Sequence, residues 1–492
     1  MKKYFLLCAM ALMLMASCGN RPEVPSSSIA MQTLPAIFPD YCNVTVPCNI
    51  APLNFMLPAA EFEACVARIT MPDGKQQTYG NGVKVQIPEK EWHAMLNAAK
   101  GQSLQVEVWG QKQGQWHSFD SFAIHVAPEP IDEYLSYRLI EPTYVAWSYM
   151  EIAQRNLTSF EETQIFNNEV TSIDREKGQC INCHSCQNYK TDNMLFHVRL
   201  SNGCTVLVND GKISSVNLKR DNTISAGVYP SWHPTEKLIA FSTNKTRQAF
   251  HTQHLNKIEV YDEASDLILY DVATDSVSIV CNDPDLLEVY PTWSPDGQYL
   301  YYCKSVPLPE EMRDKDIRTF YPKIQYNLYR RSFDVASHQF GEEELVYDAA
   351  SNDKSATLPR ISPDGKYLLF AEGQYGCFHT RHHDADIVCV PLGEETAERV
   401  DMTGLNSDGF ADSYPSWSSN GHWIMCGSRR IDEYSRVFIS YFHNGKVEKA
   451  FMLPQEDPEQ NLFLLKCYNR PEFMVEPVTI SVDEFQRVFP KK

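Results

Sequence analysis

One short pattern, present in four copies, constrains the fold of this chain most strongly. Each copy pairs a proline with a Trp or Ile, enters a tight turn and continues into an apolar run; the copies are Tyr229–Pro234, Tyr290–Gly297, Leu358–Gly365 and Tyr414–Gly421. A Pro-Asp-Gly turn reverses the chain, because Pro fixes φ at the first turn position and Gly accepts a positive φ. Repeats of this kind predict small antiparallel sheets that stack on one another. We expect the Trp or Ile to pack between neighbouring sheets.

These repeats resemble those of the TolB-like (PD40, WD40-like) family. The resemblance implies a six-bladed β-propeller over residues 194–480. Four blades are clear; a weaker first blade is expected at Met194–Val216, and a closing blade near Asn461–Val475.

The first residues predict export. Lys2 and Lys3 precede an apolar run, Tyr4–Met15, that is too short to span a bilayer, so residues 1–17 are expected to be a signal peptide. The run ends in a sequence resembling a lipobox, which makes Cys18 the expected site of lipidation. The alternative is an ordinary signal peptidase site beside a stray cysteine. Residues 18–35, rich in Pro and Ser, are expected to form a flexible tether.

Two regions lie between the tether and the repeats. Residues 36–128 alternate apolar and polar side chains in short runs, such as Val83–Ile87 and Leu104–Trp109, which predicts an immunoglobulin-like β-sandwich. Residues 129–193 lose this alternation. We expect helices at Tyr144–Leu157 and Glu161–Val170, followed by a short helical segment that carries a cysteine motif. The overall fold class is therefore mainly β.

Cys180, Cys183 and His184 form a C-x-x-C-H motif, which is the attachment sequence of c-type haem. On a helical turn, both thiols share one face and can form thioethers to one porphyrin edge, and His184 can bind the iron. The motif thus predicts covalent haem c. Because Cys186 follows closely, a zinc site and a disulfide remain alternatives.

The sequence does not decide which residue is the second axial ligand of such an iron. Met194 is our candidate, since ten residues of chain can loop from one haem face to the other. His197 and an open coordination site are the rivals. Met194 could equally pack the start of the first blade.

Other candidate sites are weaker. The cluster His379, His382, His383, Asp384 and Asp386 could bind a metal, although we favour a solvated loop. We expect no catalytic residues, because no nucleophile elbow, phosphate loop or H-E-x-x-H motif is present. The net charge of −19 argues against nucleic acid as a partner.

Three stretches carry a further resemblance: Pro47–Phe55, the cysteine cluster with Asn193–His197, and Tyr468–Phe473. On these, the whole chain also resembles a group of Bacteroidetes lipoproteins that join an N-terminal β domain, a haem c-like motif and a propeller. The sequence leaves two functions open. The first is a membrane-tethered monohaem cytochrome that passes electrons to an envelope partner, with the protein on the periplasmic side of the outer membrane. The second is a non-redox propeller that binds envelope proteins, with the cysteines as a structural disulfide.

Overall fold

The computed structural model describes residues 21–141, 149–170, 179–200, 202–308, 310, 316–393 and 398–489. The chain divides into two compact units. Unit 1 takes the chain up to Val44, Pro52–Pro128 and Pro454–Leu462, and unit 2 takes Thr45–Ala51, Glu129–Leu453 and Phe463–Lys492. In the part of the chain that the structure describes, no helix is long and apolar enough to cross a bilayer. The signal peptide and Cys18 lie outside the described residues.

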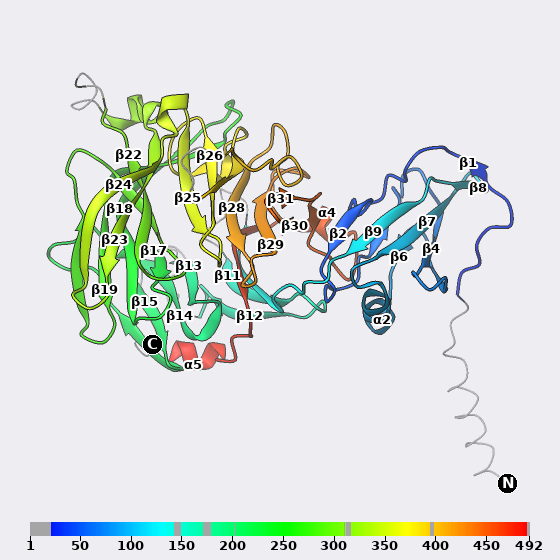
Figure 1. The fold of residues 1–492 in the computed structure, drawn as a ribbon, viewed down its shortest axis with the longest axis horizontal. Helices are drawn as coiled ribbons and strands as arrows, with labels where there is room; N and C mark the ends of the chain where they lie inside the picture. The colour runs from blue at the N-terminus through cyan, green and yellow to red at the C-terminus, as the bar shows by residue number, and fades with distance from the viewer. Residues whose placement is uncertain are drawn as a thin grey trace, which may run out of the picture. The chain divides into compact units, whose positions relative to one another are not determined.

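Unit 1 is built on one branched sheet, a separate strand pair and a helix (Figure 1). The long strand β7 pairs with β9 over its first half and with β8 over its second half. The strands and helices are β1 (Ile29–Ala30), β2 (Val44–Val46), β3 (Phe55–Met56), β4 (Ala64–Thr70), β5 (Gln76–Tyr79), β6 (Lys84–Val85), α2 (Glu89–Ala99), β7 (Ser103–Lys112), β8 (Gln115–Ser118), β9 (Phe122–Val126) and, where the chain leaves the unit, α4 (Gln460–Phe463).

Two features of unit 1 differ from the sequence prediction. The expected tether contains β1, which pairs in parallel with β8, and Met31 N donates to Ser118 O at 2.9 Å. These hydrogen bonds join the end of the tether to the sheet. The second difference is α2, which buries four side chains at helical spacing, Trp92, Met95, Leu96 and Ala99. That spacing was visible in the sequence and our strand-only prediction missed it.

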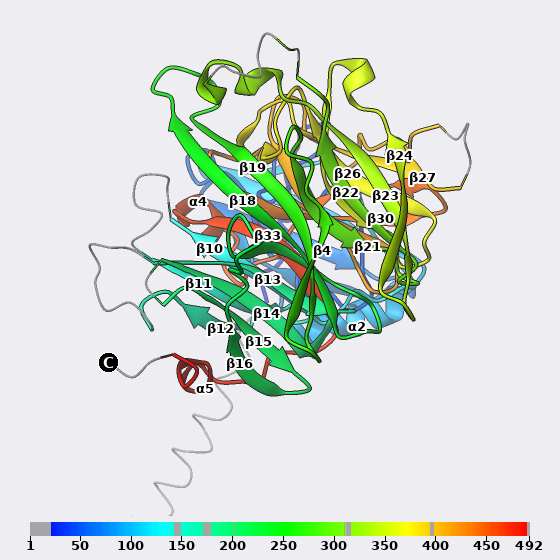
Figure 2. The ribbon, with the colours of Figure 1, turned by 90° about the vertical axis from the view of Figure 1, so that its left-hand side faces the viewer.

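Unit 2 consists of six antiparallel sheets (Figures 1 and 2). The sheet that closes the unit joins β33 (Cys467–Met474) to β10 (Tyr134–Ile140), β11 (Met150–Asn156) and β12 (Glu162–Asn167). The other five follow in chain order: β13 (Gln179–Gln187), β14 (Lys190–Leu200), β15 (Cys204–Asn209) and β16 (Lys212–Val216); β17 (Gly227–Trp232), β18 (Leu238–Phe250), β19 (Ile258–Asp271) and β20 (Ser276–Cys281); β21 (Glu288–Trp293), β22 (Tyr299–Ser305), β23 (Tyr326–Asp334) and β24 (Gln339–Tyr347); β25 (Ser355–Ile361), β26 (Tyr367–Gly373) and β27 (Asp386–Pro391); β28 (Asp412–Trp417), β29 (Trp423–Ser428), β30 (Arg436–His443), β31 (Lys446–Val447) and β32 (Phe451–Met452). Short helices are η1 (Ile317–Thr319), η2 (Tyr321–Lys323), η3 (Ala350–Asn352), η4 (His379–Arg381) and α5 (Val482–Gln486).

The six sheets form a closed ring. Each sheet has one innermost strand, and these strands contact one another around the ring in the order β13, β17, β21, β25, β28 and β33. β33 then contacts β13 again, which closes the ring. Because β33 hydrogen-bonds to β10, strands from the two ends of the unit complete one blade together. Unit 2 is therefore a six-bladed β-propeller, which confirms the predicted class.

The repeated turns and aromatic residues act as predicted. Gly297, Gly365 and Gly421 have φ of 70°, 73° and 73° in the expected turns. Trp232 packs with Leu195 and Leu207 of the preceding blade, and Trp293 packs in the same way with Leu238 and Leu269. These contacts bury the faces that the blades turn toward one another.

The segment preceding the repeats was predicted wrongly. Met150–Asn156 and Glu162–Asn167, expected as helices, are β11 and β12; residues 142–148 of the first expected helix lie outside the described part. The cysteine motif lies on β13 rather than on a helical turn. Strand pairing within the ring overrides weak local propensity here. The ring begins at β10, and the expected boundary at Met194 falls within β14, so it would cut through one blade.

Candidate functional site: an arginine-lined cavity at the propeller axis

The innermost strand of every blade contains the same β-bulge. In each blade, one residue takes a left-handed φ, and strand pairing skips that residue and its successor. The six residues are Cys183, Tyr229, Tyr290, Leu358, Tyr414 and Arg470, with φ between 50° and 58°. A bulge turns the local strand direction and re-aims side chains. Five of the six are followed by proline, and Cys183 is followed by His184.

The cysteine motif is thus the innermost-strand repeat of its blade. His184 stands at the proline position, and Cys186 stands where Trp232 and Trp293 stand in the next two blades. Cys180, Cys183 and Cys186 are free thiols, so the expected structural disulfide is absent from the described structure. Sequence reasoning missed this repeat because the aromatic residue and the proline are both replaced.

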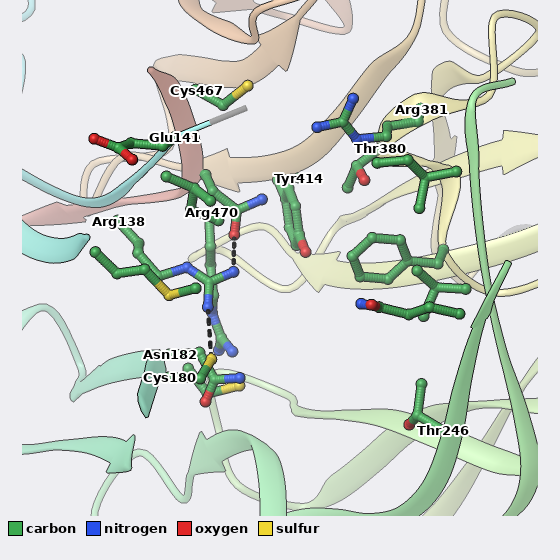
Figure 3. A pocket seen from close by; sticks show the side chains of 18 of the residues that line it. Arg138, Glu141, Cys180, Asn182, Thr246, Thr380, Arg381, Tyr414, Cys467 and Arg470 are labelled. Atoms are coloured by element: carbon green, nitrogen blue, oxygen red, sulfur yellow. Dashed lines mark hydrogen bonds between the residues drawn. The ribbon is translucent and has the colours of Figure 1, made fainter. Parts of the chain in front are cut away.

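A cavity of about 180 Å³ lies where these innermost strands meet. Cys180, Asn182, Tyr414 and Arg470 line it from the inner strands (Figure 3), and so do Cys183 and Tyr229. The hairpin β18–β19 is longer than the hairpins of the other blades, and its far end supplies one wall, through Thr246, Gln248, Phe250, Ile258 and Val260. The segment Phe378–Arg381 supplies another part.

Five arginines line this cavity: Arg138, Arg199, Arg381, Arg429 and Arg470. Arg470 Nε donates to Glu472 Oε1 at 2.9 Å, so its charge is balanced. Within the described part of the chain, none of the other four pairs with a carboxylate. Glu141 is the acidic residue among those that line the cavity. The excess of positive charge contrasts with the net charge of −19 of the whole chain.

The unpaired arginines are held in place by neutral groups or by packing. Arg138 donates from Nη1 to Ile181 O at 3.0 Å and from Nη2 to Asn469 Oδ1 at 2.9 Å. Arg429 Nε donates to Thr380 O at 2.8 Å. The guanidinium groups of Arg381 and Arg199 make no hydrogen bond to any described residue. Burial, followed by the nearby charge of Arg429, lowers the pKa of Arg381 to about 10.

The predicted haem ligands do not come together around this cavity. Cys180 and Cys183 line it, but His184 does not; the imidazole is buried, with Glu472, Arg470 and Arg138 as its main charged neighbours. Burial lowers the pKa of His184 to about 4. Met194 is 1% exposed and does not line the cavity; it packs with Ile181, Phe196 and Val198 in an apolar cluster. The observed strand therefore does not fit a haem that is bound by His184 and Met194.

The histidine cluster expected on a solvated loop is partly buried instead. His382 Nε2 lies 2.9 Å from Glu259 Oε2, and both side chains are almost fully buried. His379 Nδ1 lies 3.1 Å from Thr357 Oγ1, and its Nε2 lies 3.0 Å from Tyr375 O. These contacts attach the segment that carries Arg381 to β19 and β25. The prediction of a solvated loop was wrong because the partners come from distant strands.

Comparison with known proteins gives distant similarities. No family model matches the chain, and no curated protein matches it by sequence. Among solved structures, TolB from Acinetobacter baumannii is similar with a TM-score of 0.40 and 13% identity, over 79% of this chain and 85% of that one. A putative TolB from Agrobacterium tumefaciens has a TM-score of 0.38 and 14% identity, over 65% and 92%. These structural neighbours are TolB-like propeller proteins, and similarity at this level carries nothing about function.

Proposed function

We propose that unit 2 is a binding propeller, without a redox role, that takes a small organic anion into its axial cavity. The observation that carries the proposal is the set of four cavity arginines without carboxylate partners. The proposed function shares the non-redox propeller with the second function that the sequence left open, but its ligand is a small anion and the cysteines of the motif are free thiols rather than a disulfide.

Electrostatics gives the reason. Several guanidinium groups that share one partly enclosed space repel one another, and each has lost part of its hydration. A ligand with two or more carboxylate or phosphate oxygens offsets both costs at once. Charge-assisted hydrogen bonds of this kind are worth about 1.5–3 kcal/mol each.

The apolar part of the wall limits what else the ligand carries. Phe250, Ile258 and Val260 of the β18–β19 hairpin line the cavity together with Phe378, and Tyr229 and Tyr414 line it from the inner strands. Aromatic and aliphatic side chains of this kind favour a ligand with a planar or apolar body attached to its acidic groups.

The setting of this function rests on the sequence. We propose that Cys18 is lipidated and tethers the protein to the periplasmic face of the outer membrane, where an envelope protein is its partner. Unit 1 would then serve as a spacer or docking module of immunoglobulin-like type.

Citrate and inorganic phosphate are suitable probes, because each presents several acidic oxygens. We expect citrate to bind in titration calorimetry at constant ionic strength and Arg381→Gln to weaken it at least about tenfold, which corresponds to ~1.4 kcal/mol. Arg330→Gln, on the outer strand β23, is the matched control and should bind as the wild type does. Equal affinity in the wild type and Arg381→Gln, or no binding of either probe, would count against the proposal.

Covalent haem c at Cys180 and Cys183, the other function that the sequence predicted, is tested separately. Protein made in a host with haem c maturation should give no pyridine haemochrome spectrum, because His184 does not line the cavity. If the wild type gave a haemochrome spectrum and the Cys180→Ala/Cys183→Ala variant did not, the result would favour the cytochrome function instead.

A further inference from the structure

A second cluster of potential ligands lies outside the cavity, on the blade formed by β28–β31. Glu129, His422 and His443 each offer one ligand atom, and these atoms lie within 4.8 Å of one another. Glu129 and His422 are half-buried and His443 is exposed, so an ion can reach the cluster from solvent. Neither the proposed anion site nor the cysteine motif includes these residues.

The fold brings the three residues together from two places in the chain. His422 immediately precedes β29, and His443 ends β30, its hairpin partner. Phe442 N donates to His422 O at 2.7 Å, which fixes the register, and the two imidazole rings lie 6.0 Å apart. Glu129 comes from the segment that leads into β10.

Each ligand is also oriented by a neighbour, as metal ligands usually are. Tyr441 Oη donates to Glu129 Oε2 at 2.8 Å, and the other oxygen has no hydrogen-bond partner among the described residues. His422 Nδ1 lies 3.4 Å from Phe442 O, a contact that favours the tautomer with an unprotonated Nε2. Asn444 Nδ2 lies 2.8 Å from His443 Nε2; with its amide rotated it accepts from that nitrogen, which leaves Nδ1 for an ion.

We propose that Glu129, His422 and His443 bind a divalent transition metal, with zinc as the best match, and that water completes the coordination. Two imidazoles and one carboxylate form a donor set that suits zinc. Calcium and magnesium prefer oxygen ligands only, so this site disfavours them. Tetrahedral zinc brings its ligand atoms to about 3.3 Å from one another, so atoms that lie within 4.8 Å of one another approach by up to about 1.5 Å on binding.

The metal would strengthen the closure of the propeller ring. The segment after Glu129 already lies against the same blade, since Trp423 Nε1 donates to Pro130 O at 3.0 Å and Ser419 N donates to Asp132 Oδ2 at 2.7 Å. This segment leads into β10, whose pairing with β33 completes the ring. An ion held by Glu129 and by both histidines therefore crosslinks the start of the closing blade to its neighbour.

Cobalt is the probe, because Co²⁺ in a tetrahedral site has visible absorption bands. We expect one equivalent of Co²⁺ to give these bands in protein purified without a polyhistidine tag, Zn²⁺ to displace it, and Zn²⁺ to raise the melting temperature. Glu129→Gln and His443→Gln should each weaken Co²⁺ binding at least about tenfold. His125→Gln, an exposed histidine of unit 1, is the control and should leave both readouts unchanged.

Two outcomes would overturn the proposal. One is the absence of Co²⁺ bands together with a melting temperature that Zn²⁺ leaves unchanged. The other is retention of the bands in Glu129→Gln/His443→Gln, or strong thiolate charge-transfer absorption, since either places the ion on other residues such as the free cysteines. Circular dichroism of each variant distinguishes loss of binding from loss of fold.

Discussion

Cys183 and Tyr229 occupy equivalent positions in neighbouring blades: each has a left-handed φ, 55° and 50°, at the bulge of an innermost strand. The residue after Tyr229 is proline, and the residue after Cys183 is His184. The equivalence explains the conformation of the C-x-x-C-H segment through the propeller repeat alone.

A proline at position 184 tests this equivalence. His184→Pro should fold, because strand pairing skips this residue and five blades already carry proline there. We expect a change in the free energy of unfolding of less than about 2 kcal/mol, since the lost imidazole is buried without a hydrogen bond to any described residue. Denaturant unfolding followed by circular dichroism measures it.

His197→Pro is the matched control for that substitution. His197 lies within β14 and pairs with Asn182 on one side and Thr205 on the other. Proline at this position should lower the free energy of unfolding by about 3 kcal/mol or more, because it removes a hydrogen bond from a central strand. Equal damage from the two substitutions would show that position 184 is not the proline position of the repeat.

Removing the chain before Met194 should prevent folding of the propeller. Such a chain lacks β10–β13, so two blades are incomplete and the first strand of the ring is missing. A protein with exposed blade faces should show no cooperative thermal transition and should bind hydrophobic dyes. A sharp transition in the truncated chain would mean that the remaining blades close without these strands.

Met194 should matter for stability rather than for ligand binding. Its side chain is 1% exposed among Ile181, Phe196 and Val198, so Met194→Ala should lower the free energy of unfolding by about 2–5 kcal/mol. Leu345→Ala, at a position 53% exposed on β24, should cost much less. Citrate affinity should not change in Met194→Ala, because Met194 does not line the cavity; a large loss of affinity would show that its packing shapes the cavity wall.

Stability should decline as pH rises from about 6.5 to about 8. Burial, opposed only in part by Lys304, raises the pKa of Glu288 from 4.5 to about 8. An acid with a higher pKa in the folded state binds its proton more tightly there. Its contribution to the free energy of unfolding is therefore lost as the pH rises from the pKa of the unfolded state to the pKa of the folded state. Glu288→Gln should remove about 1–2 kcal/mol of this decline. Glu344→Gln, exposed on β24, should keep it.

Lipidation can be tested on the whole protein. We expect radiolabelled palmitate to enter the wild type and not Cys18→Ala, because the thiol of Cys18 is the expected acceptor. Signal peptide cleavage is checked in the same gel from the mobility of the two proteins. Label that persists in the variant would place the lipid elsewhere.

The sequence by itself determined the propeller class, the turns and the packing of Trp232 and Trp293, because each depends on residues that are adjacent along the chain. It also contained the helical spacing of α2, which we overlooked. Only the tertiary structure decided that β33 and β10 close the ring, that Cys183 and His184 continue the repeat, and that five arginines face one cavity. Pairing between distant strands fixes these features, and their free energy depends on partners that no local pattern specifies.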